Sequence, residues 1–126
     1  MSTILIKGAT IVNEGKTFQG SVLIKDRFIE KVTGQDNIDI NADIEIDAFG
    51  KLLLPGVIDD QVHFREPGLT HKGNIYSESK AAVAGGVTSF MEMPNTSPQT
   101  VSREELDKKF AIAKESSLAN YSSYLG

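Results

Sequence analysis

The hydrophobic pattern of this sequence changes character at Pro55-Gly56, and the pattern beyond that point limits the fold most. The elements that it predicts are a strand from Val57, a helix from Ile75, a strand over 87–91, a helix from Ser102 and a strand over 121–125. Strands that alternate with helices in this way form a parallel sheet with right-handed crossovers. The alternation alone leaves two α/β architectures open, a doubly wound sheet and a (β/α)₈ barrel.

Local signals set the limits of the two helices. The first has small or apolar side chains at helical spacing and ends at Gly85-Gly86, a pair typical of a helix end. Ser102 begins the second helix, and Glu105 three residues later completes a capping-box sequence. The side chains expected to form the buried stripe of this helix are Leu106, Phe110 and Ala113.

Residues 1–55 show no helical period and are predicted to form short strands and turns. Two apolar segments flank Lys25-Asp26-Arg27, which predicts a β-hairpin with a charged tip. Ile44 and Ile46 alternate with acidic residues, as in a strand with one buried face, and residues 47–50 follow as a turn. We therefore expect strands of a small β-sheet or half-sandwich in a first domain, residues 1–55, and a second domain over 56–126.

Composition excludes several classes of function. Thirteen Lys and Arg against 17 Asp and Glu give a net charge of −4, which argues against non-specific binding to nucleic acid phosphates. Cysteine is absent, so disulfides and thiolate ligands are excluded. No apolar stretch approaches the roughly 18 residues of a membrane span, and the N-terminus lacks the features of a signal peptide. The sequence therefore predicts a soluble, cytoplasmic protein.

Polar residues gather at the end of the strand that begins at Val57. Side chains alternate along a strand, so Asp59, Gln61 and His63 are expected to share one face, and Arg65 joins them if the extended conformation lasts that far. Active sites of parallel α/β folds lie at this end of the strands. An imidazole there can ligate zinc or another divalent metal, and a guanidinium suits a carboxylate.

Each of these residues also has a purely structural explanation. A histidine that ends a strand is more often structural than a metal ligand, and Asp59 could cap the next segment. Arg65 with Glu66 could be a surface ion pair worth under about 1 kcal/mol. His71 and Lys72 are expected to be exposed loop residues. Spacing alone predicts a polar site and nothing more specific.

Four segments of this sequence resemble, in order and spacing, the dihydroorotases of the amidohydrolase superfamily. They are Ile6–Val12, Pro55–Asp59 with Val62–Gly68, Ala81–Thr88, and Met93–Thr96. The resemblance implies a metal-dependent hydrolase with a (β/α)₈ barrel. Residues 56–126 would be the first two βα units and third strand of that barrel, and residues 1–55 would be N-terminal strands of a small β-sandwich domain.

The resemblance also implies an activity. Enzymes of this family interconvert L-dihydroorotate and N-carbamoyl-L-aspartate, a step of de novo pyrimidine biosynthesis. Hydroxide held by one or two zinc ions attacks the ring amide carbonyl, and an aspartate expected downstream of this segment moves the proton. The partner implied is thus a small-molecule substrate, with no nucleic acid or membrane, and homo-oligomerisation is left open.

Carried over residue by residue, the resemblance assigns roles to five positions. His63 matches the second histidine of the metal-binding His-x-His motif, and Gln61 occupies the place of the first. Arg65 and Asn95 match the residues that hold the substrate carboxylate. Asp59 matches an acidic residue that supports the site. Because allantoinases usually lack Arg at position 65, and hydantoinases diverge from the whole Arg-Glu-Pro-Gly block, these residues favour dihydroorotase over its relatives.

Position 61 departs from the family pattern. A glutamine carbonyl oxygen is a much weaker zinc ligand than an imidazole. Three outcomes are open: Gln61 ligates through oxygen and two metals remain, only one metal remains, or the site is inactive. The intact Arg65 and Asn95 favour retained binding of at least one zinc.

Length is the second departure. Residues 57–126 number 70, whereas a barrel uses roughly 31 residues per βα unit. The segment therefore supplies little more than two of eight units, and the later ligands are expected downstream. We expect the N-terminal portion of a longer enzyme that is inactive alone. The alternatives are a catalytically inactive dihydroorotase-like scaffold or partner subunit, or a related cyclic amidohydrolase such as allantoinase.

Overall fold

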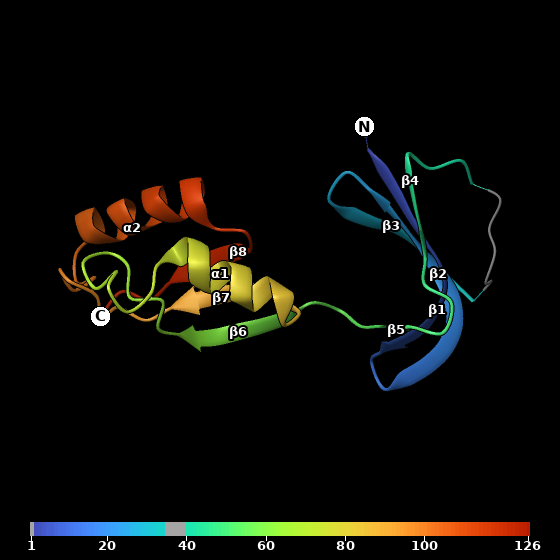
Figure 1. The fold of residues 1–126 in the computed structure, drawn as a ribbon, viewed down its shortest axis with the longest axis horizontal. Helices are drawn as coiled ribbons and strands as arrows, with labels where there is room; N and C mark the ends of the chain where they lie inside the picture. Colours follow the sequence, from blue (N-terminus) through green and yellow to red (C-terminus); the bar gives the residue numbers. More distant parts are fainter. Residues whose placement is uncertain (1, 35–39) are drawn as a thin grey trace. The chain divides into compact units, whose positions relative to one another are not determined.

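The chain folds into two compact units, Met1–Pro55 and Gly56–Gly126 (Figure 1). The computed structural model describes residues 2–34 and 40–126. Within these two stretches, no helix is long and apolar enough to span a bilayer.

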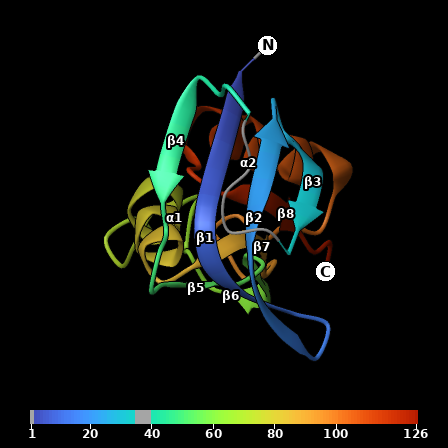
Figure 2. The ribbon, with the colours of Figure 1, turned by 90° about the vertical axis from the view of Figure 1, so that its right-hand side faces the viewer.

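The first unit is a single β-sheet. Its strands are β1 (Thr3–Asn13), β2 (Lys16–Lys25), β3 (Phe28–Thr33), β4 (Ile44–Asp47) and β5 (Leu52–Leu53). The order is β3-β2-β1-β4, and β5 also pairs with β1 (Figure 2). β2 is antiparallel to both β1 and β3, whereas β4 and β5 run parallel to β1. The predicted hairpin across residues 25–27 and the turn after Asp47 are confirmed.

One expectation for this unit is wrong. Ile44 and Ile46 are 50% and 45% exposed, so neither face of β4 is buried. The physical reason is that β4 lies at the edge of the sheet and that the described part of the unit contains no second layer. The buried core of the unit, formed by Ala9, Ile11, Val22 and Ala48, lies around β1 and β2 instead.

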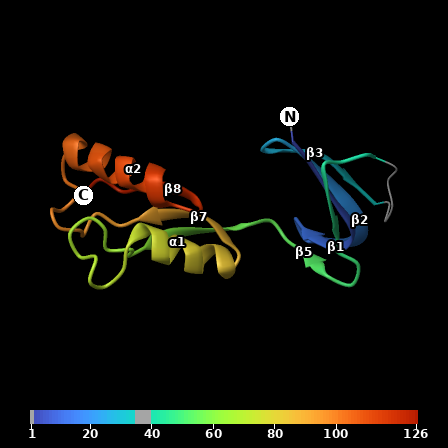
Figure 3. The same ribbon diagram turned by 45° about the horizontal axis from the view of Figure 1, so that its top comes forward.

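The second unit has the predicted alternation of strands and helices (Figure 3). Its elements are β6 (Val57–Val62), α1 (Ile75–Ala84), β7 (Val87–Glu92), α2 (Arg103–Ser116) and β8 (Asn120–Ser123). The three strands form a parallel sheet in the order β6-β7-β8. This is an open mixed α/β segment and not a closed barrel.

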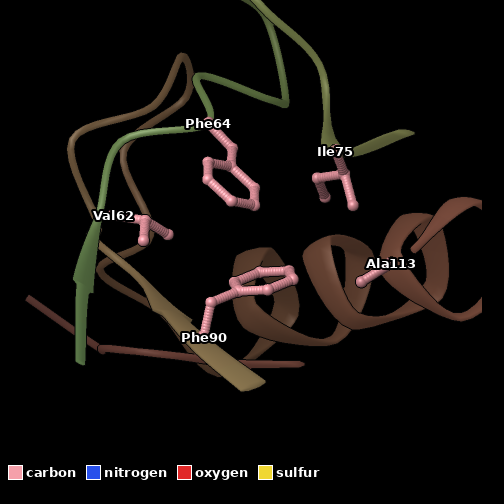
Figure 4. Close-up of a cluster of buried hydrophobic side chains, with 5 residues drawn as sticks. All are labelled: Val62, Phe64, Ile75, Phe90 and Ala113. Atoms are coloured by element: carbon pink, nitrogen blue, oxygen red, sulfur yellow. The ribbon is translucent and has the colours of Figure 1, made fainter. Parts of the chain in front are cut away.

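Both helices pack on one core with the sheet. The buried side chains of this core come from every layer: Val62, Phe64, Ile75, Phe90 and Ala113 (Figure 4). The Phe64 and Phe90 rings lie 4.5 Å apart between centroids in a tilted arrangement. Burying such a ring stabilises a fold by about 2–3 kcal/mol. The contact therefore fixes the segment that follows β6 against β7.

The helix starts agree with the sequence in part. Ser102 caps α2 by accepting the Glu105 N–H, but the Glu105 carboxylate pairs with Lys108 at 2.8 Å instead of closing the predicted capping box. A reciprocal capping box forms instead at α1, between Asn74 and Ser77. In the predicted stripe of α2, Ala113 is buried and Leu106 and Phe110 are partly buried.

Candidate functional site

The carboxyl ends of β6 and β7 bring together two of the predicted site residues. β6 ends at Val62 and β7 at Glu92, and the parallel strands deliver His63 and Asn95 to the same edge of the sheet. His63 Nδ1 lies 3.0 Å from Asn95 Oδ1, although 32 residues separate them in the sequence. Both side chains are exposed. A predicted metal ligand and a predicted substrate-binding residue are thus direct neighbours.

Glu92 holds the segment that follows His63. Its carboxylate accepts the backbone N–H of Phe64 at 2.7 Å and that of Arg65 at 3.3 Å. Only 2% of Glu92 is exposed, and burial raises the pKa of its carboxyl above the ordinary value. The two N–H donors and the charge of Lys109 work in the opposite direction. The loop after His63 is therefore held by a buried acceptor, Glu92, that the sequence pattern did not reveal.

Lys109 is the second buried charge below the site. It is 2% exposed, and its Nζ donates to Met93 O at 3.0 Å and to Ser123 Oγ at 3.2 Å. Burial lowers the pKa of Lys109, and the negative charge of Glu92 offsets part of this effect. Because Ser123 Oγ also donates to Glu92 O at 3.1 Å, the ends of β7 and β8 are tied together. The spacing from Leu106 to Ala113 placed Lys109 within the apolar stripe, a signal that could have revealed it.

The loops of the two motifs pack closely beyond the strands. The Ser97 N–H donates to Pro67 O at 3.1 Å. Gly68 has φ +82°, and a Cβ at this position would lie 1.8 Å from Ser97 O. Only glycine satisfies both the left-handed backbone and this approach. The conformation of Gly68 therefore sets how the loop after β6 meets the loop after β7.

Glu66 connects the first loop to α1. Its carboxylate accepts the Ile75 N–H at 2.8 Å, at the positive end of the helix dipole. This contact replaces the surface ion pair with Arg65 that was one alternative for these residues. His71 and Lys72 are exposed loop residues, as expected.

Arg65 and the polar residues of β6 do not follow simple alternation. Arg65 has φ +73°, so the extended conformation ends before it and the condition for a shared face is not met. The register also shifts, since Asp59 pairs with Phe90 and Val62 with Glu92. Asp59 Oδ1 accepts the Gln61 N–H at 3.1 Å within this irregular stretch. Strand parity therefore does not place Asp59, Gln61 and His63 on one face.

The described residues fit a metal ion only as part of a ligand set. His63 offers one ring nitrogen, Nε2, because Nδ1 faces Asn95. Gln61 is exposed and offers a neutral oxygen. Across residues 2–34 and 40–126, no three His, Cys, Asp or Glu side chains gather closely enough to hold a metal. Further ligands are therefore needed to complete a site.

Several known proteins are similar to this chain. The dihydro-orotase-like family matches residues 50–126. A dihydroorotase from Methanosarcina acetivorans is 39% identical over 121 residues, which covers 96% of this chain and 26% of the relative. A dihydroorotase from Carboxydothermus hydrogenoformans is 46% identical over 98 residues, or 75% of this chain and 22% of the relative.

Solved structures agree with this relationship. An L-hydantoinase (dihydropyrimidinase) from Arthrobacter aurescens has a TM-score of 0.93 and 29% identity, and the match covers 100% of this chain and 28% of that one. A D-hydantoinase has a TM-score of 0.81 and 28% identity. The chain spans about a quarter of the length of the curated relatives it matches. It belongs to the dihydro-orotase-like family of metal-dependent amidohydrolases and corresponds to their N-terminal portion.

Proposed function

We propose that this chain forms the N-terminal part of a dihydroorotase, which interconverts L-dihydroorotate and N-carbamoyl-L-aspartate in pyrimidine biosynthesis. The observation that carries the proposal is the meeting of His63 and Asn95, 3.0 Å apart, at the carboxyl end of a parallel sheet. Arg65 lies two residues after His63, in the loop that follows β6. In a member of the family, a residue expected to ligate metal thus contacts one residue expected to bind a carboxylate, and the second such residue follows two positions later in the chain.

His63 and Gln61 are the residues that would hold zinc in this segment. The chemistry that zinc supplies in such sites is a lowered pKa of water and polarisation of a carbonyl. His63 contributes an imidazole. The hydrogen bond from the Phe64 N–H to the Glu92 carboxylate fixes the backbone immediately after His63. Gln61 contributes a weaker oxygen ligand. The remaining ligands and the proton-transferring aspartate belong to the part of the enzyme beyond this segment.

Arg65 and Asn95 would bind the carboxylate of the substrate. A guanidinium forms two parallel hydrogen bonds with a carboxylate, and an amide adds further N–H donors. Glu92 accepts the Arg65 N–H and so holds the left-handed backbone from which the guanidinium side chain extends. A ring carboxylate distinguishes dihydroorotate from uncharged cyclic amides, and this favours dihydroorotase over allantoinase.

The open edges of the second unit support continuation into a (β/α)₈ barrel. Val57 and Ile58 of the edge strand β6 are 54% and 70% exposed. Apolar side chains on an unpaired strand favour pairing with a further strand. In this proposal β6, α1, β7, α2 and β8 are the first two βα units and third strand, and the first unit contributes to a small β-sandwich domain.

A second candidate is an inactive dihydroorotase-like scaffold or partner subunit. Gln61 is the observation that favours it, because an amide replaces the imidazole expected by the family. The two candidates differ in metal content and turnover. They do not differ in the fold of this segment.

The test uses the longest natural polypeptide that carries this sequence. Its intact mass, zinc content and conversion of L-dihydroorotate are measured, together with the variants Arg65→Met and Arg65→Lys. The enzyme reading predicts bound zinc and turnover, a large rise in KM for Arg65→Met and a smaller one for Arg65→Lys, which keeps the charge but loses the fork. Zinc-free protein without turnover would instead establish the scaffold.

A further inference from the structure

Backbone bonds on both sides of His63 fix its place beside Asn95. On one side, the Met93 N–H donates to Val62 O at 3.0 Å. On the other, the Phe64 N–H donates to the buried Glu92 carboxylate at 2.7 Å. The strand ends that carry the two side chains are therefore locked to each other immediately before and after His63.

The Asn95 side is held equally well. Thr96 is buried, its N–H donates to Pro94 O at 2.9 Å, and its hydroxyl donates to Pro98 O at 2.9 Å. These bonds shape the turn that presents Asn95. The contact between Asn95 Oδ1 and His63 Nδ1 consequently joins two side chains whose backbones are each anchored.

The chemistry of the contact selects one form of the imidazole. A neutral histidine carries one N–H and one bare nitrogen. An amide oxygen beside Nδ1 can accept a hydrogen bond but cannot donate one, so in a neutral His63 the Nδ1 carries the N–H and Nε2 is bare. A bare nitrogen is the form that ligates a metal, and a hydrogen bond to the opposite nitrogen is how proteins fix that form.

We infer that Asn95 is a positioning residue for His63, holding it as the Nδ1–H tautomer with Nε2 free to ligate metal. The same bond fixes the orientation of the Asn95 amide. Because Oδ1 is occupied by His63, both N–H donors of Nδ2 remain for a substrate carboxylate. Asn95 thus couples the metal ligand to the carboxylate site. The roles of His63 Nε2 and Asn95 Nδ2 rest on the proposed function, whereas the tautomer of His63 does not.

The test reads the tautomer directly by NMR in the full 126-residue chain labelled with ¹⁵N-histidine. The chain contains only two histidines, so His71 in its exposed loop serves as the internal reference. At a pH of about 8.5, roughly two units above the ordinary histidine pKa, His71 is expected to show the Nε2–H form that neutral histidine prefers in water. His63 is expected to show mainly Nδ1–H.

Variants separate a specific effect from a structural one. Asn95→Ala should shift the His63 tautomer ratio toward Nε2–H by about two- to twelve-fold, the range that one net hydrogen bond supports. Asn95→Asp keeps an acceptor and should restore Nδ1–H. Gln99→Ala removes an exposed amide from the same loop and should leave the ratio unchanged. His71 should not respond to any of the three.

Two results would overturn the inference. His63 in the Nε2–H form in the native chain would do so without any variant, and hence even if Asn95→Ala failed to fold. Persistence of Nδ1–H in a folded Asn95→Ala chain would show that another group holds the proton. A proven Nδ1–H tautomer in a zinc-free longer polypeptide would defeat the proposed function and leave the positioning role of Asn95 standing.

Discussion

Replacing Glu92 with alanine tests whether a buried carboxylate holds the candidate site together. The change removes the acceptor of two backbone N–H groups, at 2.7 Å from Phe64 and 3.3 Å from Arg65. Each buried donor left unpaired costs about 1–3 kcal/mol. Burial raises the pKa of the Glu92 carboxyl, so its charged form is less favourable here than in water. Removing this group therefore offsets part of the cost. We expect Glu92→Ala to reduce the free energy of unfolding of the second unit by about 2–3 kcal/mol.

The assay is urea unfolding followed through amide NMR signals of residues 56–126, so that the two units are observed separately. Hydrogen exchange at Phe64 and Arg65 should accelerate most. A loss below about 0.5 kcal/mol, the usual scale of a surface substitution, would refute the role assigned to Glu92. Unchanged exchange at both amides would refute it equally.

Glu92→Gln is the matched control, and it predicts a pH dependence. The amide keeps the volume and one acceptor, so its loss should be smaller than that of alanine. Because the pKa of Glu92 is higher in the folded state, the folded state favours the protonated carboxyl. The stability linked to this protonation is fully present below the unfolded pKa of about 4.5, and it is lost as pH rises through the folded-state pKa. The uncharged glutamine escapes that loss. The stability difference between native chain and Glu92→Gln should therefore shift in favour of the variant as pH rises from about 4 to 8.

Two further substitutions test the contacts around the site. Lys109→Met leaves Met93 O and Ser123 Oγ without their buried donor. It should lower the free energy of unfolding, measured in urea, by about 1–3 kcal/mol. The control Lys114→Met, at an exposed position, should cause no comparable loss. Gly68→Ala forces a Cβ to within 1.8 Å of Ser97 O and should destabilise the second unit in thermal melts. Gly86→Ala is its control, because Gly86 has a similar φ of +89° but open space around the added atom. An equal loss of thermal stability in the two variants would mean that the effect at Gly68 comes from backbone strain alone.

The sequence predicted what depends on periodicity and local signals. The alternation after Pro55, the start of α2 at Ser102 and the hairpin across residues 25–27 all follow from short-range patterns. The burial of Ile44 was wrongly predicted because a period of two identifies a strand but not what covers it. Burial of an edge strand depends on a second layer, and local patterning contains no information about that layer.

The site was predicted by residue type but not by geometry. The resemblance singled out His63 and Asn95, yet no pattern indicated that their side chains meet, because the contact depends on the register of β6 against β7. The sequence leaves open whether the extended conformation reaches Arg65, and the left-handed backbone of Arg65 belongs to a loop held by Glu92. No local sequence pattern singled out Glu92. Tertiary contacts therefore decided every feature that gives the site its shape.

Glu92 and Lys109 are the two buried charged residues that support the site. They indicate that this end of the sheet positions the site residues at some cost in stability. Burial raises the pKa of Glu92 and lowers that of Lys109, so each group is less favourable in its charged form here than in water. Apolar side chains of similar size would fill the same space without that cost, but they could not accept the N–H groups of Phe64 and Arg65 or donate to Met93 O. Those bonds anchor the segments from which His63, Arg65 and Asn95 project. Unfavourable charge burial concentrated under exposed polar side chains is the pattern expected of a functional site, and in this chain it supports the segments that carry His63 and Asn95, the residues of the proposed site.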